Sequence, residues 1–226
     1  MEITLQNASL DDLPVLAEIN RQAFMPELSA QIAFKNWPDV ENMRVFFAAR
    51  LRERLINTDT KVFKAVDVAT GIITGFVCLT LEIGDEESSG SVKPADAKKN
   101  PTQHAIEQIP DFLDLEFVMS SGAEIELMKK RMGGSKHYYV STFVVAPQYQ
   151  SHGIGTTLLS HCLSIADKEG IPAWLISFPG SHTLYLRLGF EDVEYNDLDL
   201  SKWDKRKYRG FGIYRSYAMK RPTATS

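Results

Sequence analysis

The segment from Tyr139 to Leu163 joins a β-branched run, a glycine loop and a helical pattern in direct succession. The run ends in Val-Val-Ala-Pro at 144–147, and the loop reads Gln-x-x-Gly-x-Gly at 150–155. The first N–H groups of a helix have no partner within the helix, and they lie at the positive end of its dipole. A strand, a glycine loop and a helix start in this order therefore predict a seat for an anion such as a pyrophosphate.

The two glycines of this loop, Gly153 and Gly155, carry no Cβ, so a phosphate can approach their main chain closely. Two common phosphate loops are excluded. The loop has no Gly-Lys-Ser/Thr ending, which nucleotide hydrolases require. It also lacks the third glycine of the dinucleotide-binding fold and the acidic residue that reads a ribose there. A plain strand-to-helix turn remains the alternative at this point.

Hydrophobic periodicity predicts a chain that mixes strands and helices. A helical face at 13–23 follows Ser9 as a plausible N-cap, and a second helix is expected over 39–56. Ala69-Thr-Gly71 reads as the turn of a hairpin. Strand patterns cover 2–6, 61–68, 72–83, 138–145, 173–178, 192–196 and 212–219, and further helical patterns cover 156–168 and 181–188. This order predicts one mixed α/β domain over residues 1–226.

Three segments depart from this pattern. Residues 24–38 are rich in large apolar side chains without a clean period, so they are expected to form a loop or a short helix. Residues 84–110 are rich in Asp, Glu, Ser, Lys and Pro, which predicts a flexible insertion. Residues 111–132 regain helical spacing with an interruption at 120–122, so an extra helical segment should follow the insertion.

The composition bounds the class of protein. A formal charge of −4 gives no general footprint for nucleic acid. No apolar run approaches the roughly 20 residues that span a bilayer, and the N-terminal residues lack the pattern of a secretory signal. Cys78 and Cys162 lie within a strand and a helix pattern and read as reduced core residues. We therefore expect a cytoplasmic protein with no nucleic-acid or membrane partner, and the oligomeric state is left open.

The glycine loop resembles the phosphate-binding segment of the GNAT superfamily of acetyl-CoA-dependent N-acetyltransferases, in which Gln or Arg opens the loop, as Gln150 does here. Downstream, Tyr185-x-x-x-Gly189-Phe190 is similar to a second element of that family. The Ser-x-x-Gly stretch at 177–180 resembles the form found in fungal-type members. The resemblance implies a central, mostly antiparallel twisted sheet of about seven strands, splayed at the acetyl-CoA site and flanked by helices.

The same resemblance implies where acetyl-CoA binds as co-substrate. Its pantetheine arm would pair with the main chain of the strand before the loop, and its pyrophosphate would receive N–H bonds from the loop and helix start. No metal is expected, because no His pair has metal-ligand spacing. The residues implied are Phe143, Val144, Val145, Gln150, Ser151, His152, Gly153, Ile154, Gly155 and Thr156.

Acyl transfer to an amine needs a neutral nucleophile, a stabilised oxyanion and a proton for the departing thiolate. The resemblance implies Tyr185 as the acid, and a core aromatic is its alternative role. The N–H groups near Val144 and Val145 are the expected oxyanion donors. The base stays open among His137, His152, Glu124 and Glu126, a water relay, and an amine already partly deprotonated.

These inferences predict an N-acetyltransferase that moves an acetyl group to a primary amine of a small molecule or peptide by direct attack. The alternative is a non-catalytic acyl-CoA-binding or regulatory protein, and a third reading makes 84–132 a partner-binding module. Phe24, Phe34 and Trp37 are expected either to line the acceptor pocket or to pack under a loop. The basic run at 202–209 is either a solvated loop or a contact for an acidic substrate or for CoA.

Overall fold

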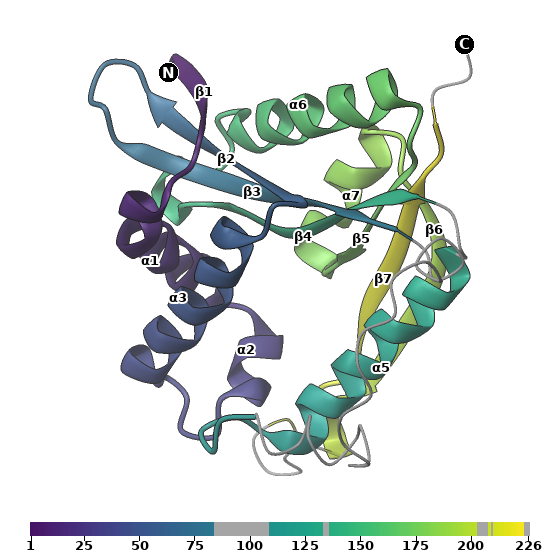
Figure 1. The fold of residues 1–226 in the computed structure, drawn as a ribbon. Coiled ribbons are helices and arrows are strands. Elements are labelled where there is room, and N and C mark those ends of the chain that lie inside the picture. The colour runs from purple at the N-terminus through teal and green to yellow at the C-terminus, as the bar shows by residue number, and fades with distance from the viewer. Residues whose placement is uncertain (84–108, 133–135, 203–207, 209, 224–226) are drawn as a thin grey trace, which may run out of the picture.

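The computed structural model describes the chain except for residues 84–108, 133–135, 203–207, 209 and 224–226 (Figure 1). In the helix at 115–132 the backbone is described, but the side chains at 124, 125, 128–130 and 132 are not. The predicted flexible insertion and most of the basic run at 202–209 therefore lie outside the described residues.

A seven-stranded sheet forms the centre of the fold, in the order β1-β2-β3-β4-β5-β7-β6. All neighbouring strands pair antiparallel except β4 and β5, which pair parallel. The predicted mixed α/β fold with about seven mostly antiparallel strands is confirmed. The strands are β1 (Ile3–Asn7), β2 (Thr60–Asp67), β3 (Ile73–Glu82), β4 (His137–Val145), β5 (Ala173–Ser177), β6 (Glu191–Asp199) and β7 (Ile213–Arg221).

Strands β4 and β5 part soon after they meet. Their register contains only Tyr138 with Ala173 and Tyr139 with Trp174. β4 then continues to Val145 and β5 to Ser177 without further pairing between them. The expected splay of the sheet is therefore present, and it opens toward the C-terminal ends of these two strands.

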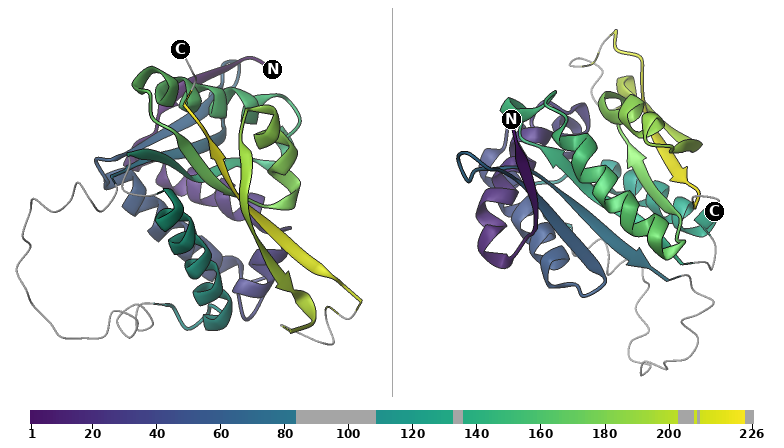
Figure 2. Two further views of the ribbon diagram at one scale, coloured as in Figure 1. Left: turned by 90° about the vertical axis from the view of Figure 1, so that its right-hand side faces the viewer. Right: turned by 90° about the horizontal axis from the view of Figure 1, so that it is seen from above.

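Helices cover both faces of the sheet (Figures 1 and 2). Helices α6 and α7 lie on one face, and α1, α2, α3 and α5 lie on the other. The views of both figures place α5 alongside the β6–β7 ribbon. The helices are α1 (Leu13–Phe24), α2 (Leu28–Ala33), α3 (Val40–Ile56), α5 (Leu115–Met132), α6 (Ile154–Glu169) and α7 (Pro179–Arg187), with single 3₁₀ turns η1 (Leu10–Asp12), η3 (Pro147–Tyr149) and η4 (Leu200–Lys202).

The sheet separates two hydrophobic cores, as alternation along its strands requires. Phe63 packs with α6 and α7 on one face, whereas its neighbour Val62 packs with α1 and α3 on the other. Both cysteines are buried and free, and burial raises the pKa of the Cys78 and Cys162 thiols to about 12. They are therefore core residues with protonated thiols, as the sequence suggested.

Two local expectations are corrected. The predicted break at 120–122 is wrong, because α5 runs without interruption from Leu115 to Met132. A Cβ added at Gly122 would meet nothing within 4 Å, so this glycine costs helix propensity without disturbing the packing. At the other end of the chain, Ser9 is an N-cap as predicted, but it caps the 3₁₀ turn η1, and its N–H donates to the Asp12 carboxylate at 2.8 Å. Helix α1 itself starts only at Leu13.

Candidate active site

The glycine loop turns the chain from β4 into α6 through two left-handed residues. Ser151 has φ 63° and Gly153, the N-cap of α6, has φ 81°. The helical ladder begins with the Thr157 N–H donating to the Gly153 carbonyl at 3.1 Å. The N–H groups of Ile154, Gly155 and Thr156 precede that bond and lie at the positive end of the helix. This is the geometry of an anion seat.

The two glycines of the loop do different work. A Cβ at Gly153 would meet nothing within 4 Å, so its requirement for glycine is conformational. A Cβ at Gly155 would lie 2.9 Å from Cζ of Phe143. Gly155 therefore lets α6 pack closely against the aromatic ring on β4. The sequence alone predicted one role for both glycines, which was to let a phosphate approach the main chain.

The first residues of the loop are fastened to β4 and to one another. The Gln150 amide Nε2 donates to the Val145 carbonyl at 3.1 Å. The His152 ring Nδ1 lies 2.7 Å from the Gln150 carbonyl oxygen. Both side chains are exposed on the surface of the loop. In this arrangement Gln150 holds the loop against the end of the strand.

The main chain of β4 is open on the side that faces β5. The Ala146 N–H donates to Thr74 on β3 at 2.8 Å, so alternation directs the N–H and C=O groups of Phe143 and Val145 away from β3. They face the gap that the splayed strands leave. The same alternation corrects one expectation: the N–H of Val144 is directed toward Phe76 of β3, so Val145 is the residue of this pair that offers an N–H to the gap.

Tyr185 lies on α7 with its ring between Phe143 and Phe190, at centroid distances of 6.1 and 5.9 Å. Its side chain is buried in the core shared with α6. Burial raises the pKa of the Tyr185 phenol to about 12, and a hydrogen bond with Ser181 acts in the opposite direction. The phenol therefore stays protonated at neutral pH and can donate a proton or a hydrogen bond, but it cannot act as a base.

Sequence reasoning missed Glu27, the N-cap residue of α2. Burial raises the pKa of the Glu27 carboxyl, and the Tyr214 hydroxyl donates to its Oε2 at 3.4 Å. The Tyr214 ring contacts the ring of Phe178, the residue that follows β5, and Phe178 contacts Phe24. Glu27 is thus linked by two aromatic rings to the end of β5, where the sheet opens. Nothing in the sequence indicated that Glu27 would lie near the end of β5, because it is a single glutamate in a segment without clean helical periodicity.

Of the other candidate bases, His137 is the first residue of β4, at the closed end of the splay. Its ring lies 3.0 Å from the Glu82 carboxylate and its side chain is buried. It lies eight positions along the strand from Val145, a distance of roughly 26 Å. Glu126 is exposed on α5, and the Glu124 side chain lies outside the described part of the chain. His137 is therefore not brought near the opening.

Three aromatic residues were expected to line an acceptor pocket or to pack under a loop. Phe24 lies at the opening through its contact with Phe178. Phe34 is buried in the cluster beneath α2 and α3, and Trp37 packs against the same cluster. Only Phe24 is therefore positioned by the structure at the end of β5.

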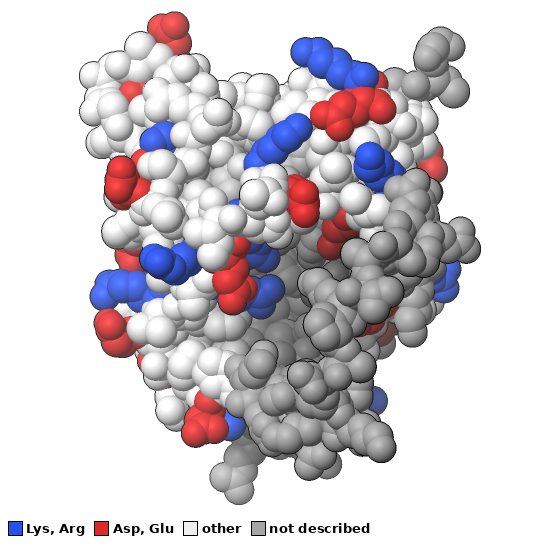
Figure 3. Space-filling model, viewed as in Figure 1, with Lys and Arg blue, Asp and Glu red and all other residues white. Residues whose placement is uncertain are grey.

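The described residues hold no group of three or more His, Cys, Asp or Glu side chains that could bind a metal ion. Within that same part of the chain, no helix has the length and apolar character needed to cross a bilayer. On the face drawn in Figure 3, Lys and Arg side chains are interspersed with Asp and Glu over the area that the structure describes.

Comparison with known proteins agrees with this geometry. Residues 119–190, which include β4, the glycine loop, α6, β5 and Tyr185, match the Acetyltransferase (GNAT) family. A search of curated proteins gives no match.

Solved structures resemble the fold over nearly the whole chain. An arylalkylamine N-acetyltransferase 2 from Aedes aegypti is 14% identical with a TM-score of 0.64, covering 98% of this chain and 99% of the other. A histone acetyltransferase HPA2 and related acetyltransferase from Corynebacterium glutamicum is 19% identical with a TM-score of 0.61, covering 100% and 99%. A PaiA N-acetyltransferase from Thermoplasma acidophilum in complex with coenzyme A is 17% identical with a TM-score of 0.55, covering 98% and 99%. At these identities the likeness establishes the fold.

Residues 119–190 therefore match the GNAT acetyltransferase family, and the seven-stranded sheet has the fold of solved acetyltransferases. The reaction class that this match supports is acetyl-CoA-dependent acyl transfer, which makes the chain an acyltransferase.

Proposed function

We propose that this protein transfers an acetyl group from acetyl-CoA to a primary amine of a small molecule or peptide by direct nucleophilic attack. The observation that carries the proposal is the open main-chain edge of β4, which leads into a glycine-rich anion seat at the start of α6. This arrangement suits a ligand with an amide-bearing arm and a pyrophosphate, because an extended arm can add to a free strand edge.

Acetyl-CoA would bind along this edge as the co-substrate. Its pantetheine amides would pair with the main chain of Phe143, beside the gap to β5, because the Val145 carbonyl already accepts a hydrogen bond from Gln150. Its pyrophosphate would accept N–H bonds along the loop from Ser151 to Thr156. Gln150 would contribute by holding the loop against Val145. No metal has a role in this scheme.

The chemistry would follow from three groups around the opening. Glu27, or a water bound to it, would accept the proton that the acceptor ammonium must lose before it attacks. The Val145 N–H would stabilise the oxyanion of the tetrahedral intermediate. When the intermediate collapses, the C–S bond breaks and the departing thiolate would receive a hydrogen bond or a proton from Tyr185. A raised pKa suits Glu27 to the base role, because it brings the carboxylate closer to the operating pH.

A non-catalytic acyl-CoA-binding role is the competing interpretation. The observation in favour of the non-catalytic role is that the strand before the loop carries no carboxylate. Glu27 offers a carboxylate from α2 instead, so the catalytic interpretation is favoured. We further propose that the protein is cytoplasmic and of the fungal type, on the reduced cysteines and the Ser177-x-x-Gly180 stretch.

The test is steady-state thiol release from acetyl-CoA with a panel of amines, polyamines, amino acids and peptides. Glu27→Gln should lower kcat by about 10²-fold or more with an acceptor found in that panel, because a general base contributes on that scale. The wild-type rate should fall as pH decreases through the raised pKa of Glu27, and this dependence should vanish in the variant. Glu41→Gln, an exposed change on α3, is the matched control. Amine-independent binding of acetyl-CoA without thiol release would support the non-catalytic role.

A further inference from the structure

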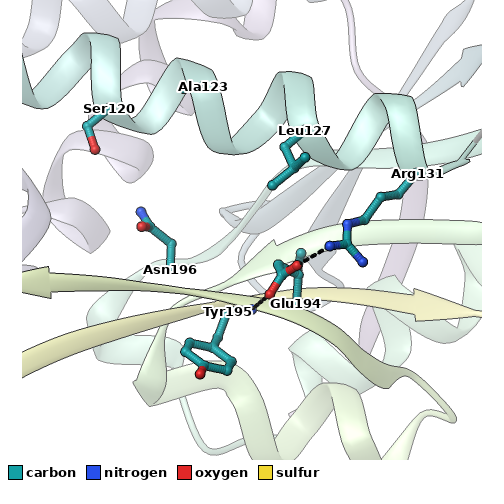
Figure 4. A pocket seen from close by; sticks show the side chains of 8 residues that line it. Ser120, Ala123, Leu127, Arg131, Glu194, Tyr195 and Asn196 are labelled. Carbon is teal, nitrogen blue, oxygen red and sulfur yellow. Dashed lines mark hydrogen bonds and ion pairs between the residues drawn. The ribbon is translucent and has the colours of Figure 1, made fainter.

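A cavity of about 480 Å³ lies between α5 and the β6–β7 ribbon (Figure 4). Ser120, Leu127 and Arg131 point into it from the helix, and Asn196 points up from β6. The Leu127 side chain is 46% exposed, which is high for a leucine on the inner side of a helix. A cavity of this size lies within the range of small-molecule sites, roughly 300–1,000 Å³.

The α5 residues at the cavity explain why it is open. Ser120 and Ala123 are small, so the helix stands over the strands without filling the space between them. Ala218 on β7 is also small, and Leu127 adds an apolar wall. Ser120 and Asn196 add hydrogen-bonding groups. Among the described side chains, the middle of the cavity is therefore lined by apolar groups and two polar ones, and the charged ones lie at its end.

A charged pair marks one end of the cavity. Arg131 of α5 and Glu194 of β6 form an ion pair, and their side chains remain 47% and 31% exposed. Because each charge neutralises the other, a ligand group with a single charge would have to compete with the pair. An uncharged end group would leave it intact.

The other end of the cavity leads toward the proposed reaction centre. A second hollow of about 30 Å³ shares Ser120 and Asn196 with the first and is also lined by Phe178 and Tyr214. Tyr214 donates to Glu27, the proposed base. Along β7, Tyr214 and Ala218 are four positions apart, a rise of roughly 14 Å.

We infer that the cavity between α5 and β6–β7 binds the body of the acceptor, and that the acceptor is a primary amine with an elongated, uncharged body. This inference rests on the proposed function, because it takes the Glu27 end as the site of attack. The amine would lie at Glu27 and Tyr214, the apolar body would pass Ala123 and Leu127, and the far end would meet the intact ion pair. Helix α5 is then the element that selects the acceptor.

The test uses four amines of one length that differ only in the far end group: decylamine, 10-amino-1-decanol, 1,10-diaminodecane and 10-aminodecanoic acid. Binding to the CoA-loaded protein is measured by calorimetry, and acetylation is measured by thiol release. The wild-type protein should bind the two compounds with uncharged ends about fivefold or more tightly than the two with charged ends, on the scale of a partly exposed ion pair.

Breaking the ion pair should change this preference in opposite directions. Glu194→Gln leaves Arg131 without its partner and should favour the carboxylate compound by about fivefold, whereas Arg131→Gln should favour the diamine. Asp197→Asn breaks a cross-strand pair with Arg215 on the opposite face of the same ribbon and should change neither preference. The corresponding four-carbon amines, too short to reach the pair, should not respond to any variant.

The outcomes separate the inference from the proposed function. A reversed end-group preference with acetylation supports both, and a reversed preference in binding without any acetylation supports the cavity while overturning the proposed function. Acetylation that ignores the end group in the wild type and in both variants overturns the cavity inference alone. Neither binding nor acetylation of any amine overturns both.

Discussion

The proposed role of the buried Tyr185 phenol as a proton donor can be tested by removing its single oxygen. Its ring is held between Phe143 and Phe190, so Tyr185→Phe should keep the packing and remove only the donor. We expect kcat to fall by about 10²-fold, with the Kd for acetyl-CoA unchanged, because loss of a general acid costs on that scale. Single-turnover kinetics with a calorimetric binding control would measure this. Full turnover in the variant would make Tyr185 a core residue.

The glycine loop permits a similarly focused test. Gly153 requires glycine for its φ of 81°, while the space around its Cβ position is open. Gly153→Val should strain the loop by about 1–3 kcal/mol and raise the KM for acetyl-CoA tenfold or more. Gly71, at φ 70° in the β2–β3 hairpin and also with open space, is a matched control. Gly71→Val should lower the free energy of unfolding and leave that KM unchanged; equal KM values for both variants would remove the phosphate role.

At the level of single residues, the sequence offered candidate site residues only where a local pattern marks them, and their roles stay predictions. Gly153 follows from the order of strand, loop and helix, and Tyr185 follows from the resemblance. Glu27 could not be found, because its meaning depends on Tyr214, which lies 187 positions away in the chain. Nor could the sequence show that Gly155 accommodates the Phe143 ring, because that contact is set by how α6 packs on β4.

Among the elements, regular periodicity predicted the strands and helices of the sheet region well, and tertiary packing decided the exceptions. Strand β6 extends from Glu191 to Asp199, beyond the predicted 192–196, because it pairs along its length with β7. The bulge between Cys78 and Leu79 of β3, opposite Ser141 of β4, has no mark in the sequence. Such features depend on partners that lie far away along the chain.

Helix α5 is anchored by the residues that precede its N-terminus. Phe34 at the end of α2 stacks on Phe112 at 6.0 Å and forms a bridge with Leu113. Phe34→Leu should lower the free energy of unfolding by about 1 kcal/mol and loosen this anchor. If α5 forms the wall of the acceptor site, the KM for the amine should rise while that for acetyl-CoA stays constant. Phe63→Leu, in the opposite core, is the control and should change stability only.

At the scale of the whole molecule, the proposed function would place the two substrates on opposite faces of the splayed sheet. The glycine loop and α6 lie on one face, and α1, α2, α3 and α5 lie on the other (Figure 1). The proposed site is therefore the gap through which the faces communicate, with Val145 on one side and Phe178 on the other. This explains why the loop that predicts the donor carries no information about the acceptor: the acceptor would meet elements from other parts of the chain.

The stability of the folded chain should depend on acid through Glu18, which lies where α1 meets α3. Hydrogen bonds from Arg21 at 2.6 and 2.9 Å lower the pKa of the Glu18 carboxyl from 4.5 to about 2, and Arg44 of α3 adds a weaker contact at 3.6 Å. A carboxyl whose pKa is lowered in the folded protein stabilises the fold at pH values above its pKa in the unfolded chain. That stabilisation is lost as the pH falls from about 4.5 to about 2.

Because the Glu18 side chain is a third exposed, the stabilisation should be about 1 kcal/mol, well below the full value of its pKa shift. Glu18→Gln should therefore lower the free energy of urea unfolding at pH 7 by that amount, and the two proteins should converge near pH 2. Glu53→Gln, an exposed change on α3, should follow the wild type throughout. A constant difference between the Glu18 variant and the wild type at all pH values would assign the effect to packing, because lost packing does not titrate.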